Sequence, residues 1–346
     1  MKKVNVGVVG LGMGRAHLRG YQGAHAKIVA LCDINQDRLD TAQREFNVPD
    51  VFEDFDEMLA MKELDAVSIA LPNRLHEPFT VKALRAGKHV LCEKPMAMSA
   101  KEARRMTRAM EQTGRLLMIH FNNRFRPQAR ALKSFIERGD LGDIYYVRTV
   151  WNRRLGVPRP GTWFTQKEQS GGGPLIDLGV HRLDLALWLL GSPNVVTVSG
   201  TLHDTLMRDY CKCIGAKADV EDFAAAFVRT DTNAVIALEA SWISFTKKRE
   251  DNYTLVLGSK GGAVDGNMGE GYDFSLTLFQ DVDGHRTETI VTDFPATENP
   301  QQHFVNCILK GEQPMASAYD GLTVMKVLDA IYKSAQLGRE VKVKSN

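Results

Sequence analysis

Residues 4–33 read VNVGVVGLGMGRAHLRGYQGAHAKIVALCD, and this stretch decides the fold of the first third of the chain. A short apolar run rich in β-branched residues occupies 4–9, and a second apolar run at 27–33 ends in an acid. Between them the glycine-rich turn GLGMG at 10–14 opens a segment that can be helical. Strand, glycine turn, helix and strand in this order predict a βαβ unit with parallel strands.

The same alternation continues to about residue 121. Apolar runs predict further strands at 64–72, 89–95 and 115–121, and 51–54 predicts a brief strand or turn. Amphipathic segments predict helices at 36–46, 54–62 and 76–86, and Ser99 with Glu102 three residues later begins a long helix. Because each strand is an unbroken apolar run, we expect a parallel sheet that helices cover on both faces.

The pattern changes after residue 121. Longer runs alternate polar and apolar residues with a period of two, which predicts an antiparallel sheet with one buried face, at 143–151, 194–202, 222–230, 234–244, 252–266, 274–281 and 287–294. Helices are expected at 128–138, 299–311 and 318–337. Because 346 residues exceed what one hydrophobic core usually spans, we expect two domains, 1–121 and 122–346.

The composition is that of an ordinary globular protein. The net charge of +2 gives no reason to expect nucleic acid or an anionic membrane as a partner. No apolar run is long enough to cross a bilayer, and the N-terminus flows into a strand without a cleavage site for a signal peptide. The five cysteines are odd in number and scattered, which favours reduced thiols in the cytoplasm. Cys211 and Cys213 form the one close pair and lack nearby partners, so we expect no metal site.

The glycine turn has the context that a phosphate-binding loop requires. Gly10 permits the tight turn, Gly12 lets the backbone approach a pyrophosphate, and the following helix offers N–H groups at its N-terminus. Gly14 stands one residue short of the usual third position, so the loop alone is weak support. Asp33 strengthens the interpretation because it ends the second strand about 20 residues later, where a carboxylate binds the ribose hydroxyls of a dinucleotide.

Asp33 also indicates which dinucleotide is bound. A carboxylate at this position repels a 2′-phosphate, and Ile34 brings no positive charge, so NAD(H) is favoured over NADP(H). Arg38 lies close enough in the sequence to keep NADP(H) use open. The alternative is a glycine turn and a surface aspartate in some other α/β sheet.

Residues 171–191, GGGPLIDLGVHRLDLALWLLG, predict a helix that is apolar nearly all round and therefore buried, with Pro174 in its first turn. Asp177, His181 and Asp184 interrupt it at spacings of four and three, which place them on one face. Burying these groups is costly unless they are paired or face a cavity. The polar stripe therefore either lines an active site or is a structural Asp–His pair inside a core.

Two more polar stretches follow strands of the first sheet. EKP at 93–95 ends one strand, and PNRLH at 72–76 follows the preceding one. Open α/β sheets bind ligands at the carboxyl ends of their strands. Lys94 is therefore either directed into such a site or exposed to solvent, and His76 either borders the site or begins a helix.

Together these residues resemble the glucose–fructose oxidoreductase/inositol dehydrogenase (Gfo/Idh/MocA) family over essentially the whole chain. The resemblance rests on the glycine loop with Asp33 and on the motifs PNRLHEP at 72–78, CEKP at 92–95, FNNRFRP at 121–127 and GGGPLIDLGVH at 171–181. It implies an α/β chain with an N-terminal Rossmann domain and a C-terminal α+β domain with a large, mostly antiparallel sheet. The open face of that sheet commonly joins subunits in this family, so a homo-dimer or homo-tetramer is expected.

The resemblance also implies the site residues. Lys94, Asp177 and His181 match the catalytic trio of the family. Arg124 belongs to the FNNRFRP motif and is expected at the junction of cofactor and substrate. From the adenosine end to the nicotinamide end, the cofactor is expected to meet Gly10, Gly12, Met13, Gly14, Asp33, Ile34, Arg38, Leu71, Pro72, Asn73, His76, Glu93, Lys94 and Asn122.

These roles give a mechanistic hypothesis, the oxidation of a secondary alcohol by NAD⁺. His181 acts as base in oxidation and acid in reduction, since imidazole suits proton transfer near neutral pH. Lys94 binds the same oxygen and stabilises alkoxide character, and Asp177 binds a neighbouring hydroxyl. Sugars, inositols and sugar acids carry such adjacent hydroxyls. Asp184 is expected as a partner of His181 or Arg182.

Position alone suggests further substrate contacts. Asn152 and Arg153 end a strand of the second sheet, and Trp163 precedes the glycines of 171–173. Arginine suits a carboxylate or phosphate, but these residues are equally compatible with a solvated surface or a subunit interface.

Two other functions stay open at this point. The same resemblance allows an NAD-dependent glycosidase, which oxidises its substrate transiently and shows no net reduction of NAD. A non-catalytic, NAD-binding regulatory protein on this scaffold is the third alternative, and the presence of both Lys94 and His181 argues against it.

Overall fold

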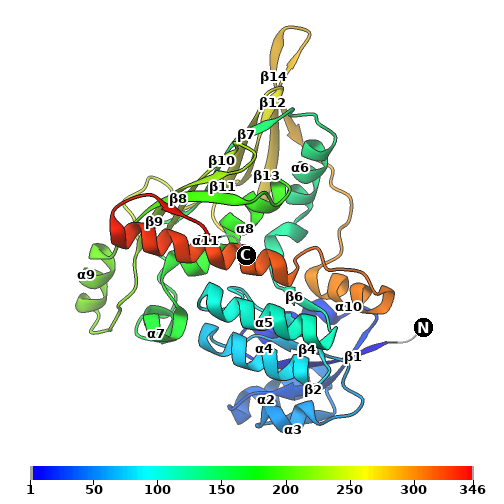
Figure 1. The fold of residues 1–346 in the computed structure, drawn as a ribbon. Coiled ribbons are helices and arrows are strands. Elements are labelled where there is room, and N and C mark those ends of the chain that lie inside the picture. The colour runs from blue at the N-terminus through cyan, green and yellow to red at the C-terminus, as the bar shows by residue number, and fades with distance from the viewer. Residues whose placement is uncertain (1–2, 345–346) are drawn as a thin grey trace. The chain divides into compact units, whose positions relative to one another are not determined.

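The computed structural model describes residues 3–344 and contains two compact units (Figure 1). The first unit comprises the chain up to Asn122 together with Glu298–Met325, and the second comprises Asn123–Thr297 together with the residues from Lys326. The sequence patterns place every residue after 121 in the second domain. In the structure, the segment Glu298–Met325 belongs to the first unit instead. The physical reason is a helix in that segment, α10 (Pro300–Lys310), which packs on the first sheet.

The first unit is built on a parallel sheet with the strand order β3-β2-β1-β4-β5-β6. Every pair in it is parallel, which confirms the predicted Rossmann-like arrangement. Central strand residues such as Val6, Val8 and Leu91 are fully buried, as a sheet covered on both faces requires. The strands are β1 (Val4–Val9), β2 (Ala26–Cys32), β3 (Asp50–Phe52), β4 (Ala66–Ile69), β5 (His89–Cys92) and β6 (Leu117–Ile119).

Helices connect these strands and begin and end at recognisable signals. The Ser99 hydroxyl accepts the N–H of Glu102 at 3.3 Å, as the cap pattern predicts, and Gly114 ends the same helix in the left-handed conformation. The helices are α1 (Gly14–Tyr21), α2 (Gln36–Phe46), α3 (Phe55–Leu59), α4 (His76–Arg85) and α5 (Ala100–Thr113), with α10 packed on α1, β1 and β5.

The second unit contains a large sheet with the order β14-β13-β12-β11-β7-β10-β9-β8-β15. Its pairs are antiparallel except for β7 with β10, so the predicted mostly antiparallel sheet is confirmed. The strands are β7 (Ile144–Arg153), β8 (Val195–His203), β9 (Phe223–Thr230), β10 (Val235–Ser241), β11 (Glu250–Gly258), β12 (Gly261–Asn267), β13 (Phe274–Val282), β14 (His285–Val291) and β15 (Val341–Lys342).

The helix α6 (Pro127–Glu137) packs on β12 and β13 of this sheet, and α8 (Val180–Leu189) packs on β7 and β10. Burial alternates along strands such as β9 and β13. The predicted single helix over 171–191 is divided into a π-helical turn, Leu175–Gly179, and the helix α8. The other helices are α7 (Lys167–Ser170), α9 (Thr205–Cys213) and α11 (Ala318–Leu337), within which the division between the units falls. Across residues 3–344, the helices are all too short or too polar to traverse a lipid bilayer.

Candidate active site

The carboxylate of Asp33 holds the glycine turn in place. Its Oδ2 accepts the N–H of Leu11 at 2.7 Å, and its Oδ1 accepts the N–H of Asn35 at 2.9 Å. A carboxylate offers about four lone-pair positions, so both oxygens keep capacity for ribose hydroxyls. Nη1 of Arg38 lies 3.8 Å from Oδ2, so the arginine that leaves NADP(H) use open is located beside the acid. The neighbouring Ile34 is 92% exposed.

The turn itself requires glycine at two positions for steric reasons. Gly10 has φ +86°, and a Cβ there would lie 2.5 Å from the carbonyl oxygen of Ala70. A Cβ on Gly14 would lie 2.8 Å from the side chain of Val8, so this glycine lets α1 approach β1 closely. Gly12 differs, because a Cβ there would meet only Arg38, at 4.0 Å. The backbone at Gly12 is therefore open to a ligand, as a pyrophosphate cradle requires.

His76 connects the turns that follow β4 and β5. Its Nε2 lies 2.8 Å from the carbonyl oxygen of Leu71, and its Nδ1 lies 2.7 Å from that of Pro95. The ring is 1% exposed, and burial lowers the pKa of His76 while the two carbonyls oppose this. His76 thus shapes the turn that carries Leu71, Pro72 and Asn73.

Lys94 follows β5 and is partly buried. Its backbone N–H is donated to Oε2 of the preceding Glu93 at 3.1 Å. The other carboxylate oxygen of Glu93 faces two imidazoles, those of His17 and His120. Burial disfavours the charge on Glu93, but these imidazoles outweigh it and hold the pKa of Glu93 well below its usual range. An ionised carboxylate therefore anchors the segment that carries the lysine.

The polar stripe of the second unit lies at the start of the buried helix. His181 of α8 is 8% exposed, and its ring centroid lies 5.7 Å from that of Trp151. Asp177 lies in the π-helical turn, where its Oδ2 accepts the indole N–H of Trp242 at 3.1 Å. Single π-helical turns are frequent at functional sites, which is consistent with a role for this segment beyond packing.

The glycines before the stripe allow a close approach of the chain to itself. A Cβ on Gly173 would overlap the carbonyl oxygen of Glu221, and one on Gly172 would overlap the hydroxyl of Tyr332. The Glu221 carboxylate accepts the N–H of Leu175 at 3.2 Å and the Tyr332 hydroxyl at 2.9 Å. Burial raises the pKa of Glu221, and these donors oppose it. The start of the π-helical turn is thus fixed by a buried carboxylate.

Asp184, the third residue of the stripe, forms a buried ion pair that the sequence did not indicate. Its Oδ2 and Oδ1 accept hydrogen bonds from Nε and Nη2 of Arg124, at 2.9 and 2.6 Å. Both residues are almost completely buried, at 0% and 1% exposure. Arg124, expected at the junction of cofactor and substrate, therefore directs its guanidinium to Asp184, 60 residues further along the chain.

The substrate contacts expected from position alone have partners within the second unit. Arg153 donates its Nε to Glu250 at 2.9 Å, and Asn152 donates its side-chain amide to Glu239 at 3.2 Å. The ring of Trp163 stacks on that of Phe164, with the ring centroids 3.9 Å apart. Arg153 is thus neutralised by a carboxylate of its own chain.

Arg182, one of the two partners expected for Asp184, is a buried charged residue. It is 0% exposed, and its guanidinium lies 5.3 Å from the ring of Trp151. No residue in the described part of the chain forms a hydrogen bond with its nitrogens. Burial, and then the charge of Arg126, lowers the pKa of Arg182 to about 9. A basic residue within an otherwise apolar helix is the signal that could have identified it.

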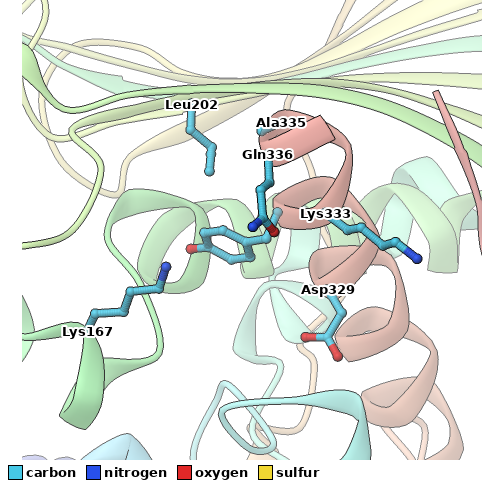
Figure 2. Close-up of a pocket in the computed structure, with 7 residues that line it drawn as sticks. Lys167, Leu202, Asp329, Lys333, Ala335 and Gln336 are labelled. Atoms are coloured by element: carbon cyan, nitrogen blue, oxygen red, sulfur yellow. The ribbon is translucent and has the colours of Figure 1, made fainter. Parts of the chain in front are cut away.

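Figure 2 shows a surface hollow of the second unit, between α7, β8 and α11, with a volume of about 760 Å³. Lys167, Leu202 and Asp329 are among its lining residues. None of the residues predicted for the site lines this hollow, so it carries no part of the proposed chemistry.

Comparisons with known proteins extend over both units. The family model described as "Oxidoreductase family, NAD-binding Rossmann fold" matches residues 4–121, and the "GFO/IDH/MocA C-terminal domain" matches residues 129–264. The chain is 30% identical to D-glucoside 3-dehydrogenase of Escherichia coli (strain K12), with 92% of this chain and 90% of the relative covered. It is 27% identical to scyllo-inositol 2-dehydrogenase (NAD(+)) of Bacillus subtilis (strain 168), with 99% and 96% covered.

Solved structures agree with these relatives. Levoglucosan dehydrogenase in complex with NADH and levoglucosan superposes with a TM-score of 0.87 at 25% identity, covering 99% of this chain and 100% of the other. Aldose-aldose oxidoreductase from Caulobacter crescentus, complexed with glycerol, gives a TM-score of 0.86 at 27% identity, with 98% and 99% covered.

Proposed function

Because the chain belongs to the Gfo/Idh/MocA family of oxidoreductases, we propose that it is an NAD(P)-dependent dehydrogenase of a sugar, inositol or sugar acid. It moves a hydride between the nicotinamide and a secondary alcohol of the substrate. The observation that carries this proposal is similarity along nearly the whole chain to enzymes named as dehydrogenases of glucosides and inositols. The retention of Lys94, Asp177 and His181 in this chain supports catalysis over a regulatory role.

The residues around the glycine turn fit a dinucleotide. The open backbone at Gly12 suits the pyrophosphate, and the Asp33 carboxylate keeps lone pairs for ribose hydroxyls. When bound, the cofactor supplies the hydride acceptor. We assign Leu71, Pro72, Asn73 and Asn122 to the nicotinamide end, with His76 fixing the turn that carries the first three.

The chain's own groups supply proton transfer and orientation. We assign His181 as the base that takes the hydroxyl proton in oxidation, since imidazole is matched to proton transfer near neutral pH. The Lys94 ammonium donates to the same oxygen and stabilises its developing negative charge. Asp177 accepts a hydrogen bond from a neighbouring substrate hydroxyl while its Oδ2 is oriented by Trp242.

A screen of polyols, sugars and sugar acids with NAD⁺ and NADP⁺ tests this function. We expect absorbance of reduced nicotinamide to accumulate with at least one free polyol or sugar. Cleavage of a glycoside without such accumulation would favour the transient-oxidation alternative. If neither an alcohol nor a glycoside is turned over with either cofactor, the proposal is wrong.

Cofactor preference is expected to depend on Asp33. Asp33→Asn keeps an acceptor for the N–H of Leu11 but removes the charge that repels a 2′-phosphate. We expect the ratio of kcat/KM for NADP⁺ to that for NAD⁺ to rise about tenfold, and Arg38→Met in the same background to reverse part of the gain. Initial rates with both cofactors measure this ratio. An unchanged ratio in Asp33→Asn would contradict the assignment.

We further propose a homo-dimer or homo-tetramer through the open face of the second sheet. That face exposes apolar residues on three strands: Phe227 of β9, Phe279 of β13 and Ile290 of β14 are 38%, 38% and 63% exposed. Exposed large apolar side chains on a sheet face are candidates for an interface between subunits. Sedimentation velocity should show an oligomer that dissociates in the double variant Phe227→Asp/Phe279→Asp, and a wild-type monomer would refute the proposal.

We also propose a cytoplasmic location. Within residues 3–344 all five cysteines are unpaired, which suits a reducing compartment. Fractionation of the source cells tests this directly, and recovery in an extracellular or periplasmic fraction would exclude it.

A further inference from the structure

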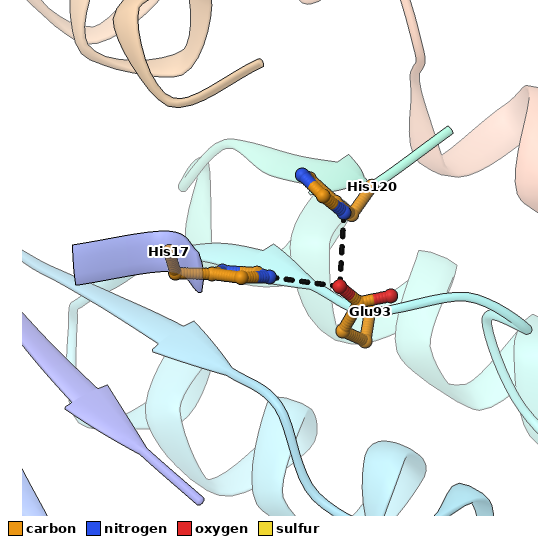
Figure 3. Close-up of side chains that lie close together, drawn as sticks. All are labelled: His17, Glu93 and His120. Atoms are coloured by element: carbon orange, nitrogen blue, oxygen red, sulfur yellow. Dashed lines mark hydrogen bonds and ion pairs between the residues drawn. The ribbon is translucent and has the colours of Figure 1, made fainter. Parts of the chain in front are cut away.

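Two histidines that the proposed chemistry leaves without a role meet the carboxylate next to Lys94 (Figure 3). His17 of α1 places Nε2 2.8 Å from Oε1 of Glu93, and His120, just after β6, places Nδ1 2.9 Å from the same oxygen. Their ring centroids are 4.5 Å apart. His17 is fully buried and His120 partly so. A helix and the ends of two strands are therefore joined at one carboxylate oxygen.

A second layer of hydrogen bonds orients both rings. Nδ1 of His17 lies 2.9 Å from the hydroxyl of Ser68, which lies 3.0 Å from that of Tyr21. Nε2 of His120 lies 3.1 Å from the side-chain amide nitrogen of Gln301 in α10. If the Gln301 amide donates to Nε2, a neutral His120 ring must carry its proton on Nδ1. That Nδ1–H then donates to Glu93. The Gln301 amide thus favours the His120 tautomer that donates to the carboxylate, and the Ser68 hydroxyl is compatible with a His17 that donates from Nε2.

The same three groups are also candidate ligands for a metal ion, since their ligand atoms all lie within 4.8 Å of one another. Zinc ligands at about 2.0–2.1 Å in a tetrahedral site are roughly 3.3 Å apart. The nitrogens instead lie 2.8 and 2.9 Å from the carboxylate oxygen, the separation of a charge-assisted hydrogen bond. The geometry therefore favours a carboxylate that two N–H groups hold directly.

This carboxylate also acts on Lys94. Oε2 of Glu93 accepts the backbone N–H of Lys94 at 3.1 Å, while Oε1 is occupied by the imidazoles. His17 lies on α1, the helix that the glycine turn opens, one turn after Gly14. The position of the Lys94 backbone is thereby coupled to the helix that follows the proposed pyrophosphate loop.

We propose that His17, Glu93 and His120 form a positioning clamp that sets the backbone of Lys94 relative to α1. The clamp residues act through Lys94, whose ammonium must lie within hydrogen-bond distance of the reacting oxygen. This inference rests on the proposed dehydrogenase function of Lys94. A misplacement of a reacting group by about 1 Å can lower the rate of an enzyme about 100-fold, so the clamp has a measurable effect on turnover.

The first test removes the charge of the clamp. Glu93→Gln keeps the shape of the side chain but presents an amide where three N–H donors converge. We expect kcat to fall about 100-fold, well beyond the change in the Kd for NADH, whose nicotinamide end Glu93 is expected to border. Glu111→Gln is the matched control, because Glu111 accepts an exposed hydrogen bond from Tyr319 and should leave kcat unchanged. Thermal unfolding of both variants separates misplacement of Lys94 from loss of the fold.

The second test uses the reach of the side-chain amides. An amide nitrogen of Gln reaches the position of Nε2 in histidine, and that of Asn reaches the position of Nδ1. His17→Gln and His120→Asn should therefore retain most of kcat, while His17→Asn and His120→Gln should lose about 100-fold. This crossed pattern follows from the atoms that contact Glu93, and a purely structural role for the rings does not produce it. Equal losses in all four variants would overturn the proposal.

Two further measurements need no turnover. Reductive methylation of the Lys94 amine, followed by peptide mass spectrometry, should change its rate in Glu93→Gln and stay constant in Glu111→Gln. An unchanged methylation rate in Glu93→Gln would overturn the clamp. If every alcohol tested were inert, that separate result would reject the proposed function and would leave this test of the clamp intact. Metal analysis of the purified protein should find no stoichiometric ion. If the protein instead held one zinc per chain and Glu93→Gln lost it, the three residues would form a metal site and the clamp would be wrong.

Discussion

Lys94→Met and His181→Asn should each lower kcat about 10³-fold or more, the largest effects on activity expected in this protein. His181→Asn removes the base that takes the hydroxyl proton, and Lys94→Met removes the cation that stabilises the resulting charge on oxygen. Neither side chain contributes to the proposed adenosine and pyrophosphate contacts. The Kd for NADH, measured by fluorescence titration, should therefore change less than about threefold.

Matched variants on the surface control for this experiment. Lys82→Met removes a lysine whose exposed ion pair with Asp56 is remote from the proposed roles, and His203→Asn changes an exposed histidine in the same way. Both should retain wild-type kcat. Near-normal kcat in Lys94→Met and His181→Asn together would reject the catalytic assignment, whereas loss in only one would reject the assignment of that residue.

The largest expected effect on stability is that of Asp184→Ala. This change leaves the Arg124 guanidinium buried without its bidentate partner, which lay at 2.6 and 2.9 Å. Breaking one side of a buried ion pair costs about 3–5 kcal/mol of the free energy of unfolding, because a charge in a low-dielectric interior loses its bidentate partner. Urea unfolding followed by circular dichroism measures the loss. A decrease below about 1 kcal/mol would contradict the prediction.

Two comparisons separate the charge from the packing. The double variant Arg124→Met/Asp184→Leu replaces the pair with apolar side chains and should recover most of the stability, as buried pairs elsewhere do. Asp204→Ala breaks an exposed pair with Arg208 and should cost less than about 1 kcal/mol. If the double variant is as unstable as Asp184→Ala, the loss comes from packing and not from the unpaired charge.

Both sheets could be predicted from the sequence because their signals are local. Unbroken apolar runs such as 4–9 and period-two runs such as 222–230 indicate parallel and antiparallel strands within a few residues. The return of Glu298–Met325 to the first unit could not be predicted in this way. Its helix has an ordinary amphipathic pattern, which indicates a buried face but not the surface that buries it. The π-helical turn at Leu175–Gly179 depends likewise on contacts with Glu221, a distant residue.

The candidate site also contains residues that local sequence signals predict and residues that they do not. The glycine turn and Asp33 were recognisable because they lie within one βαβ unit, and the Glu-Lys-Pro and Asp-x-x-x-His motifs are each contiguous. The role of His17 could not be predicted because its partner Glu93 lies 76 residues away, and a single histidine in a helix carries no signal of its own. One indication was available: Ser68, Glu93 and His120 are polar residues in or just after neighbouring buried strands. Arg124 lies in a motif and Asp184 in the polar stripe, but no local signal pairs them across 60 residues.

The interrupted course of the first unit has a consequence for biosynthesis. A ribosome adding about 5–20 residues per second needs roughly 10–40 s to travel from Asn122 to Met325. During this interval the nascent sheet lacks α10, the helix that packs on β1 and β5. The second unit also waits for its last strand, because β15 pairs with β8. Strict N-to-C folding of complete domains is therefore excluded for this chain, and β1 and β5 lack the cover of α10 until Glu298–Met325 has been made.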